Sequence, residues 1–392
     1  MLLSIALIIL IALMLAKIFN LLKLPPILGM LLTGILIGPF ALDLIDVNIL
    51  NISADLREIA LIVILIRAGL SLDLEDLKKV GRPAVLLSFI PATIEIVTVT
   101  LVAPMIFDID YVTALMMGAI IAAVSPAVVV PRMIKLMESG YGRAKRIPHM
   151  ILAGASIDDV YVIVLFYAFL KLGQGENFHI STLLNVPIAI ILGVVVGFFI
   201  GWIASHFFKK FHMRDTVKVL IIFALGFLFV ALEDSLDKFI VLSGLLAVMA
   251  FGISLNKNYP HLAKRLVKKF EKIWVIAEIM LFVLVGALVD VRVLLDVGLF
   301  AILLIVISMT FRMLGVYLSL IKTPLNTKEK LFTAISYTPK ATVQAAIGAI
   351  PLSLGLAHGE LILLVSVLAI IITAPFGAIL MDHLCSKWLV KS

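Results

Sequence analysis

The chain has 392 residues, of which 63% are hydrophobic and 15% charged, and its formal net charge is +7. A soluble protein of this length carries far more charge, so the composition predicts an all-α protein that crosses a membrane many times. The basic residues lie mainly at the ends of apolar runs, which membrane topology explains without nucleic acid as a partner. The single cysteine, Cys385, excludes an internal disulfide.

Apolar runs long enough to cross a bilayer follow one another along the whole chain. Each crossing needs roughly 20 apolar residues, and we expect about thirteen transmembrane helices. The first run has no basic leader and no cleavage site, so it is interpreted as a retained helix. The expected spans lie at 2–19, 26–42, 55–71, 82–107, 111–137, 147–171, 180–208, 213–232, 238–255, 272–289, 293–321, 330–353 and 358–384.

The loops between these spans alternate in charge. The basic set begins with Lys17 and Lys23 and ends with Lys387 and Lys391, whereas the intervening loops carry acids such as Asp108. The positive-inside rule then predicts an N-terminus outside and a C-terminus in the cytoplasm. We expect a multi-pass protein of a cell membrane, in a prokaryote the inner or plasma membrane. This orientation requires an odd number of spans, and thirteen meets the requirement.

A faint internal repeat divides the chain into two halves. Gly69–Asp73 resembles Gly286–Asp290, and Ser125-Pro126 resembles Thr338-Pro339. We interpret the pattern as two inverted six-helix repeats joined by a linker helix at 179–211. Inverted repeats of this kind are a recurring plan of secondary transporters.

Two of the expected spans contain proline-centred interruptions, at Ser125–Pro131 and at Tyr337–Thr342. Proline removes a backbone hydrogen bond, and unpaired backbone at membrane depth is tolerated only where it lines protein or a wet cavity. Matched breaks in two halves therefore predict crossed broken helices around a binding site. We expect Lys340 to neutralise the carbonyl ends of the half-helices. For either break alone, an ordinary proline kink is the alternative.

Two adjacent acids, Asp158 and Asp159, lie inside an apolar span. An ionised carboxylate is expensive in hydrocarbon and usually faces a cavity or a partner. Adjacent helix positions differ by about 100° around the axis, so the two side chains cannot aim at one point. One acid can face an aqueous cavity while the other faces a neighbouring helix.

Three further charges are expected at the same depth as the two aspartates. Counted from the charged loops at about 1.5 Å per residue, Glu95, Arg312 and Lys340 all fall near the bilayer midplane. Glu95 and Arg312 have matching depth and opposite sign, so we predict that they form a buried structural ion pair. The five charges together leave one negative charge, which one monovalent cation or one proton would neutralise.

The segments Ser125–Pro131, Ser156–Asp159 and Pro339–Ala345 together resemble the motifs of the monovalent cation/proton antiporters. The branch that they look most like is the NHA-type sodium/proton exchangers, and the likeness covers essentially the whole chain. At the first break this chain has Ser125-Pro126 where better-known bacterial relatives carry Thr-Asp, so it lacks the acid that those relatives have there.

The resemblance implies a homodimer in the lipid bilayer, in which an ion-carrying core moves against a scaffold. It implies that Asp159 is the main ion-binding acid and that Asp158 is its companion, facing Lys340. Asp158 and Asp159 would hold the transported Na⁺, and Ser125 completes the expected ion- and proton-binding residues. Neither an enzyme activity nor a cofactor is expected. The scaffold halves would lie at 1–80 and 212–290, and the core halves at 81–178 and 291–392.

These features predict a sodium (or lithium)/proton antiporter that works at one midplane carboxylate site by elevator-like alternating access. A sodium-coupled solute symporter and a non-transporting sensor on the same scaffold are the alternatives. An intramembrane aspartyl protease is disfavoured because its two acids must come from different helices. The sequence leaves open the selectivity among Na⁺, Li⁺ and K⁺. It also leaves two stoichiometries open: electrogenic exchange if Lys340 releases its proton in each cycle, and one-for-one exchange if it stays charged.

Overall fold

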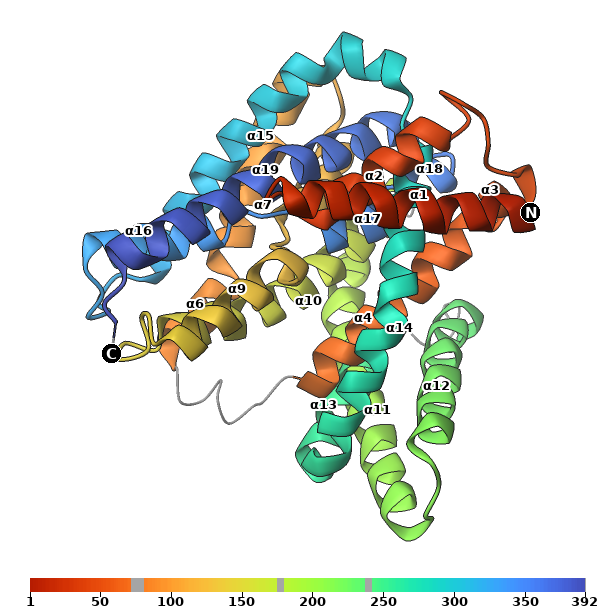
Figure 1. Cartoon of the computed structure of the whole chain (residues 1–392), viewed down its shortest axis with the longest axis vertical. Helices are drawn as coiled ribbons and strands as arrows, with labels where there is room; N and C mark the ends of the chain where they lie inside the picture. Colours follow the sequence, from red (N-terminus) through yellow and green to blue (C-terminus); the bar gives the residue numbers. More distant parts are fainter. Residues whose placement is uncertain (72–80, 175–179, 237–241, 392) are drawn as a thin grey trace. The chain divides into compact units, whose positions relative to one another are not determined.

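The computed structural model describes residues 1–71, 81–174, 180–236 and 242–391. Within these ranges the chain is helical and contains no strand, apart from an isolated β-bridge between Tyr141 and Lys391. The helices are shown in chain order in Figure 1. The first nine are α1 (Leu2–Leu21), α2 (Pro26–Ile37), α3 (Val47–Asn51), α4 (Ser53–Ser71), α6 (Arg82–Leu87), α7 (Ile90–Phe107), α8 (Tyr111–Ala122), α9 (Pro126–Ser139) and α10 (Ile147–Gly173). The others are α11 (Ile180–Lys210), α12 (Asp215–Leu236), α13 (Gly244–Asn258), α14 (Pro260–Ala287), α15 (Val291–Ser319), α16 (Thr327–Ser336), α17 (Thr342–Ile347), α18 (Ile350–Ser353) and α19 (Gly359–Trp388).

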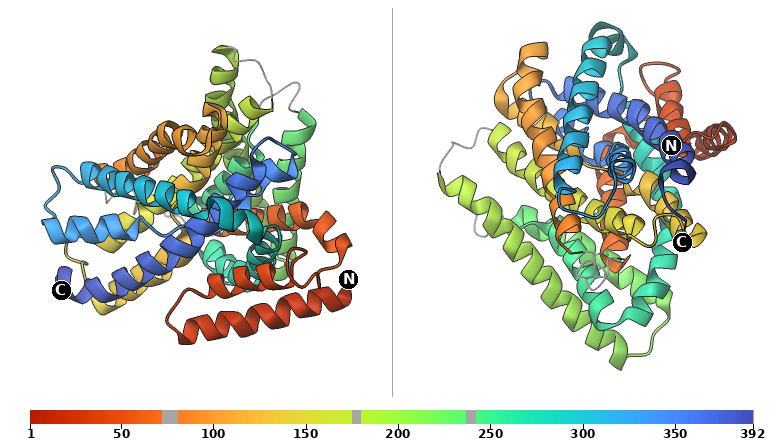
Figure 2. Two further views of the ribbon diagram at one scale, coloured as in Figure 1. Left: turned by 90° about the horizontal axis from the view of Figure 1, so that it is seen from above. Right: turned by 90° about the vertical axis from the view of Figure 1, so that its left-hand side faces the viewer.

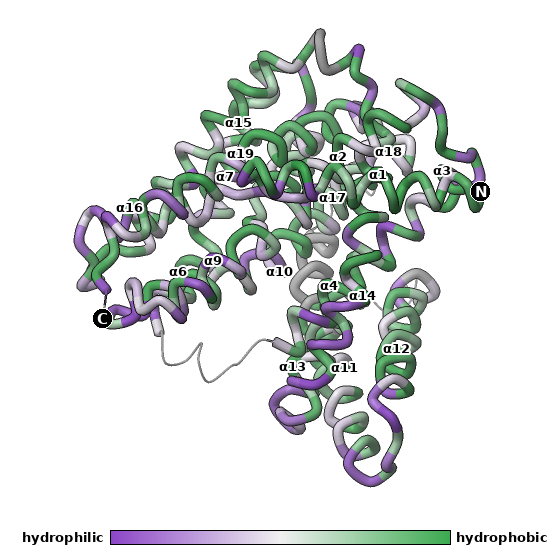
Figure 3. Tube along the Cα trace, in the orientation of Figure 1, coloured by the Kyte–Doolittle hydropathy of each residue, from purple (hydrophilic) through white to green (hydrophobic). Residues whose placement is uncertain are grey.

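Long apolar helices dominate the part of the chain that the structure describes. Hydrophobic residues run along the helices, and hydrophilic residues gather at connections such as that between α11 and α12 (Figure 3). Each of the thirteen expected runs coincides with at least one helix, but the number of membrane crossings stays a prediction. Within the described ranges, eight helical stretches are long and apolar enough to cross a membrane: Leu2–Leu21, Arg82–Phe107, Tyr111–Ser139, Ile147–Gly173, Ile191–Lys210, Asp215–Glu233, Val297–Ser319 and Gly359–Trp388.

The chain divides into two compact units. The first combines Met1–Ala54, Asp76–Gln174 and Ile279–Ser392, and the second combines Asp55–Glu75 with Gly175–Glu278. Nearly all of both expected core halves therefore falls in the first unit. The assignment of scaffold and core roles to these segments stays a prediction.

Helix α14 begins earlier than the sequence suggested. We expected a span starting at 272, because the basic residues before it look like a loop, whereas the helix runs unbroken from Pro260. Lysine and arginine are good helix formers, and their long side chains reach water from a helix surface. The exposed Lys264 and Lys268 lie on this first part of α14. A charge run thus marks where the apolar segment begins and not where the helix begins.

Within the first unit, α7 packs along α15, and the right-hand view of Figure 2 shows the two helices side by side. The close approach depends on Gly315 of α15, where an added Cβ would meet the backbone of Pro91 in α7 at 2.8 Å. Helix α7 also packs on α8, and α10 packs on α8 and α9. These contacts bring the charge-bearing spans together.

Candidate functional site

The first break separates α8 from α9. Helix α8 ends at Ala122, the backbone is extended at Ala123 and Ser125, and α9 restarts at Pro126. Proline at the first helical position has no N–H that needs a partner, and it keeps the preceding residue out of the helical region. The Ser125-Pro126 pair therefore accounts for both the extended segment and the restart.

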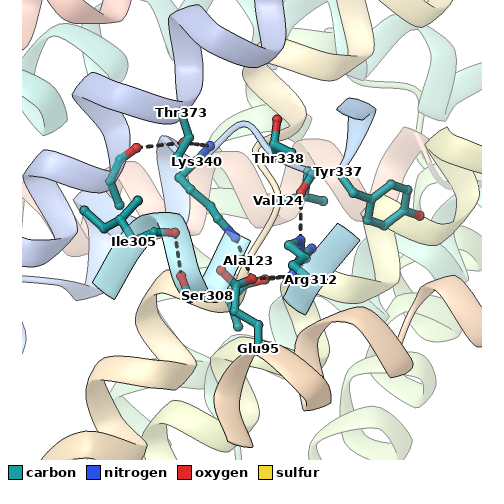
Figure 4. Close-up of polar contacts among 12 residues, drawn as sticks. Glu95, Ala123, Val124, Ile305, Ser308, Arg312, Tyr337, Thr338, Lys340 and Thr373 are labelled. Carbon is teal, nitrogen blue, oxygen red and sulfur yellow. Dashed lines mark hydrogen bonds and ion pairs between the residues drawn. The ribbon is translucent and has the colours of Figure 1, made fainter. Parts of the chain in front are cut away.

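The second break separates α16 from α17. Helix α16 ends at Ser336, and α17 begins at Thr342 after a segment that contains Pro339. Thr373 of α19 holds this segment, because its Oγ1 accepts a hydrogen bond from the Lys340 N–H at 2.9 Å and donates to the Ala369 carbonyl at 2.7 Å (Figure 4). An irregular backbone segment is thereby fixed inside the protein.

The two breaks contact each other directly. The Ser125 N–H donates to the Pro339 carbonyl at 2.7 Å. Gln344 of α17 reaches back to the first break, where its Nε2 donates to the carbonyls of Ile120 and Ala123 at 3.0 and 2.9 Å. The interruptions in the two halves therefore form one joined structure.

Arg312 of α15 satisfies the carbonyl ends of both interrupted helices. Its Nη1 donates to the Ala122 carbonyl at the end of α8, and its Nε donates to the Tyr337 carbonyl at the end of α16, the latter at 2.7 Å. A helix end leaves carbonyls unpaired and carries a partial negative charge, which a buried cation offsets. The expectation that Lys340 has this role is wrong. The planar guanidinium has five donors and can address several acceptors at once, which a compact ammonium group cannot.

Glu95 of α7 binds both basic residues. Its Oε2 accepts from Arg312 Nη1 at 2.9 Å and from Lys340 Nζ at 2.7 Å. The carboxylate lies between the two cations in Figure 4. The contact expected between Glu95 and Arg312 is present, and the Glu95 and Arg312 side chains are both fully buried. Its role in holding a moving bundle together stays a prediction.

Asp158 contacts a different partner from the one expected. Its Oδ2 accepts from Arg312 Nη2 at 2.9 Å and from the Val124 N–H at 3.0 Å. We expected it to face Lys340, but the ammonium group of Lys340 binds Glu95 instead. Arg312 lies between the two acids and uses both ends of its guanidinium fork on them. The result is a buried row of alternating charges, Lys340–Glu95–Arg312–Asp158, with no net charge.

Asp159 is left outside this row. It is the next residue of α10, so its side chain leaves the helix about 100° away from that of Asp158. Asp159 is partly buried, and its Oδ1 is shielded from solvent without a hydrogen-bond partner among the described residues. No ion pair reaches it in that part of the chain. Of the two adjacent acids, Asp158 contacts neighbouring segments, as expected for one of them. That Asp159 faces an aqueous cavity stays a prediction.

Several buried side-chain oxygens of the segments described above have no hydrogen-bond partner among the described residues. Buried polar atoms are almost always hydrogen-bonded, so unpaired ones need an explanation. Ser125 is fully buried, and its Oγ has no hydrogen-bond partner among the residues that the structure describes, although it precedes the first turn of α9. Within the described ranges, the buried side-chain oxygens without a hydrogen bond belong to Glu95, Ser125, Asp158, Asp159, Tyr337, Thr342 and Gln344. All come from the two breaks or from the segments that carry the charges.

The sequence reading missed two groups that shape the site. Gln344 stands out as a polar residue in an apolar span, but nothing in the pattern says that it pairs with α8. Nothing in the sequence pattern marks Thr373 as part of the site, because threonines are common in membrane helices. Among the described residues, no group of three or more His, Cys, Asp or Glu side chains is placed to hold a metal ion. The expected Na⁺ ligands Asp158 and Asp159 stay a prediction.

Comparisons with known proteins agree with the motifs. The transmembrane model of the sodium/hydrogen exchangers matches residues 6–385. Sodium/hydrogen exchanger 9B2 of Mus musculus is 33% identical over 393 residues, covering 96% of this chain and 72% of the relative. Sodium/hydrogen exchanger 9B1 of Homo sapiens is 34% identical over 389 residues, covering 94% and 73%. The solved structure of the sodium proton antiporter MjNhaP1 from Methanocaldococcus jannaschii at pH 8 shares the fold, with a TM-score of 0.85 at 23% identity over 98% of this chain and 97% of that chain.

Proposed function

Because this chain belongs to the sodium/hydrogen exchanger family, we propose that it is a sodium (or lithium)/proton antiporter whose exchange occurs at Asp159. The resemblance expected from the motifs is confirmed by the family match and by the exchanger relatives. The observation that carries the proposal is the closed row of four charges beside one uncommitted carboxyl group. Lys340, Glu95, Arg312 and Asp158 balance one another, so one more charge at Asp159 needs one more cation.

A proton or a sodium ion supplies that charge, and the two compete for the same carboxyl group. Burial disfavours an ionised carboxylate that has no counter-ion. The core that bears Asp159 therefore moves only when this carboxylate is neutralised, by H⁺ in one direction and by Na⁺ in the other. This single condition couples sodium transport to proton transport, because the core does not move while Asp159 is ionised and has no ion bound.

The contact between Lys340 and Glu95 supports one-for-one exchange. Glu95, 2.7 Å from the Lys340 ammonium group, favours the charged form of Lys340, whereas burial and the nearby Arg312 cation act against it. We propose that the ion pair with Glu95 holds the charged form. Lys340 then keeps its proton through the cycle, and each turn exchanges one sodium ion for one proton. The electrogenic alternative requires Lys340 to release its proton, which would leave Glu95 with Arg312 alone.

The unpaired oxygens support a small hard cation as the substrate. Oxygen ligands suit such ions, whereas soft metals prefer sulfur and nitrogen. We propose that Asp159 and Asp158 hold Na⁺ or Li⁺ and that the Ser125 hydroxyl adds a neutral oxygen. A sodium-coupled symporter would also need a polar cavity for its solute. The unpaired oxygens that the structure describes lie on the two breaks and on the segments that carry the charges, so they do not indicate a separate solute site.

The larger architecture is part of the proposal. We infer thirteen membrane spans in two inverted six-helix repeats, with the N-terminus outside and the C-terminus in the cytoplasm of a cell membrane. The alternating charge of the loops supports this orientation. Movement of the core against a scaffold, and assembly as a homodimer, rest on the family resemblance.

The test is proton movement in proteoliposomes that hold a proton gradient and a pH-sensitive dye. NaCl, LiCl, KCl and choline chloride are added in turn to the wild type, Asp159→Asn and Asp110→Asn, the last being a matched loss of charge outside the membrane. We expect dequenching with sodium and lithium that is lost only in Asp159→Asn. Retained exchange in a folded Asp159→Asn protein would refute the role of this residue.

A second arm tests the stoichiometry. Sodium-driven proton movement is measured with the membrane potential clamped at zero and at an imposed value. One-for-one exchange moves no net charge, so its rate and end point should be the same at both potentials. A rate that follows the imposed potential would favour proton release by Lys340.

A further inference from the structure

One peptide bond of the first break is held from both sides. Its carbonyl, on Ala123, accepts from Gln344 Nε2 at 2.9 Å, and its N–H, on Val124, donates to Asp158 Oδ2 at 3.0 Å. The C=O and N–H of a trans peptide point in opposite directions. Gln344 and Asp158 therefore lie on opposite sides of this peptide, and each fixes one end of it.

The amide group of Gln344 has a single chemically sensible orientation. Gln344 is fully buried, and its Nε2 donates to two carbonyls, those of Ile120 and Ala123. A flipped amide would set its oxygen against both carbonyl oxygens, so the donors must face α8. Its Oε1 has no hydrogen-bond partner in the described part of the chain. The amide is thus anchored by its two donated bonds.

We propose that Gln344 is a positioning residue for the ion site, an inference that rests on exchange at Asp159 with Asp158 as the companion ligand. Gln344 orients the Ala123–Val124 peptide, and the N–H of that peptide orients the Asp158 carboxylate. Hydrogen bonds at the two ends of one peptide also polarise each other, so the bond from Gln344 strengthens the one to Asp158. The Val124 N–H and Arg312 Nη2 both donate to Asp158 Oδ2, which leaves Asp158 Oδ1 for the cation.

The direct test compares Gln344→Met with the wild type. Methionine has similar length and volume but no hydrogen-bond donor. The Ala123–Val124 peptide then loses its hydrogen bond from Gln344 and keeps the one to Asp158. We expect the apparent KM for sodium to rise about fivefold or more, the factor that the loss of one buried hydrogen bond gives, with kcat within about twofold. Thr33→Val is the matched control, because it removes a fully buried hydrogen bond, from Thr33 Oγ1 to the Gly29 carbonyl, in α2 and not in an interrupted helix.

A coupling measurement separates positioning from general damage. Sodium affinity is measured by calorimetry for the wild type, Gln344→Met, Asp158→Asn and the double variant. If Gln344 acts through Asp158, the double variant should match Asp158→Asn alone. A further loss of affinity in the double variant, or an unchanged KM in a folded Gln344→Met protein, would overturn the inference.

A second variant keeps the test decisive if Gln344→Met does not fold. Replacing the Ala123–Val124 amide bond by an ester removes the N–H that Asp158 accepts and leaves every side chain in place. We expect the same rise in KM for sodium, and an unchanged KM would again overturn the inference. Failure of the proposed function looks different, because the wild type itself would then move no protons in response to sodium.

Discussion

Lys340 Nζ lies 2.7 Å from Glu95 Oε2, the same oxygen that Arg312 Nη1 approaches to 2.9 Å. One buried carboxylate oxygen thus serves two cations that come from different segments. Arg312 has a second acid, Asp158, whereas the only ion pair that Lys340 makes among the described residues is with Glu95. Glu95 is therefore the group on which the charge balance of the row depends most.

Glu95→Gln should be strongly destabilising. It leaves the buried ammonium group of Lys340 without a counter-charge, and removal of one partner from a buried ion pair costs about 3–5 kcal/mol. We expect a lower thermal unfolding temperature in detergent. Adding Lys340→Met should restore part of the loss, because the unpaired charge is then gone. A double variant no more stable than Glu95→Gln would show that the Lys340 pair is not the cause.

Arg312→Lys should be as harmful as a charge-removing change, although it keeps the charge. The lysine retains one point charge but cannot serve two carbonyls and two carboxylates together. Leaving buried carbonyls such as those of Ala122 and Tyr337 unpaired costs about 1–3 kcal/mol each. Thermal unfolding of Arg312→Lys beside Arg132→Lys, a change at the partly exposed Arg132–Asp382 pair, measures the difference. Equal melting temperatures for the two variants would contradict the capping role.

Gly34→Ala should destabilise the packing of α2 on α14. An added Cβ at Gly34 would overlap the Val283 carbonyl of α14, and backbone cannot move aside as a side-chain end can. Overpacking of this kind costs about 1–3 kcal/mol. Gly173→Ala is the control, because the nearest atoms there belong to the end of the flexible Met116 side chain. We expect a drop in unfolding temperature for Gly34→Ala alone, and equal effects would contradict the close contact.

Asp110 gives the fold a measurable dependence on pH. It caps the N-terminus of α8, accepting from the N–H groups of Val112 and Thr113 at 2.8 and 2.9 Å. Partial burial opposes the charged form, but the hydrogen bonds from Thr113 and Val112 outweigh it and hold the pKa of Asp110 below its ordinary value. A carboxyl group whose pKa is lowered by folding stabilises the fold above its unfolded pKa of about 4, and that contribution is lost as the pH falls further.

Asp110→Asn keeps the cap and removes the titration. The difference in unfolding temperature between the wild type and Asp110→Asn should therefore be largest near neutral pH and shrink below about pH 4. Thermal melts of both proteins at pH 7, 5, 4 and 3 measure it. A difference that is constant with pH would contradict the shifted pKa of Asp110.

The sequence predicted that these charged groups come together better than it predicted which of them pair. Distances along a helix follow from residue counts, so Glu95 and Arg312 could be placed at one level and are in contact. Which neighbour a side chain chooses depends on helix rotation and rotamer, and residue counts do not contain these. The pairing of Asp158 with Lys340 that the family resemblance implies is not the one present, because Lys340 binds Glu95.

The breaks show the same division between local and long-range information. Proline chemistry is local, so the interruptions at Ser125-Pro126 and around Pro339 could be read from the sequence. The groups that satisfy the freed backbone come from distant segments, as Arg312 and Gln344 do. Their selection requires the packed structure.

The most direct measurement of the central claim is the number of protons released when sodium binds. Calorimetry in buffers of different ionisation enthalpy gives this number for the purified protein, below the pH of half-maximal exchange. The account predicts one proton per sodium ion for the wild type and for Asp110→Asn, and neither sodium binding nor proton release for Asp159→Asn. Two protons per ion, or undiminished release from a folded Asp159→Asn protein, would contradict exchange at this one carboxyl group.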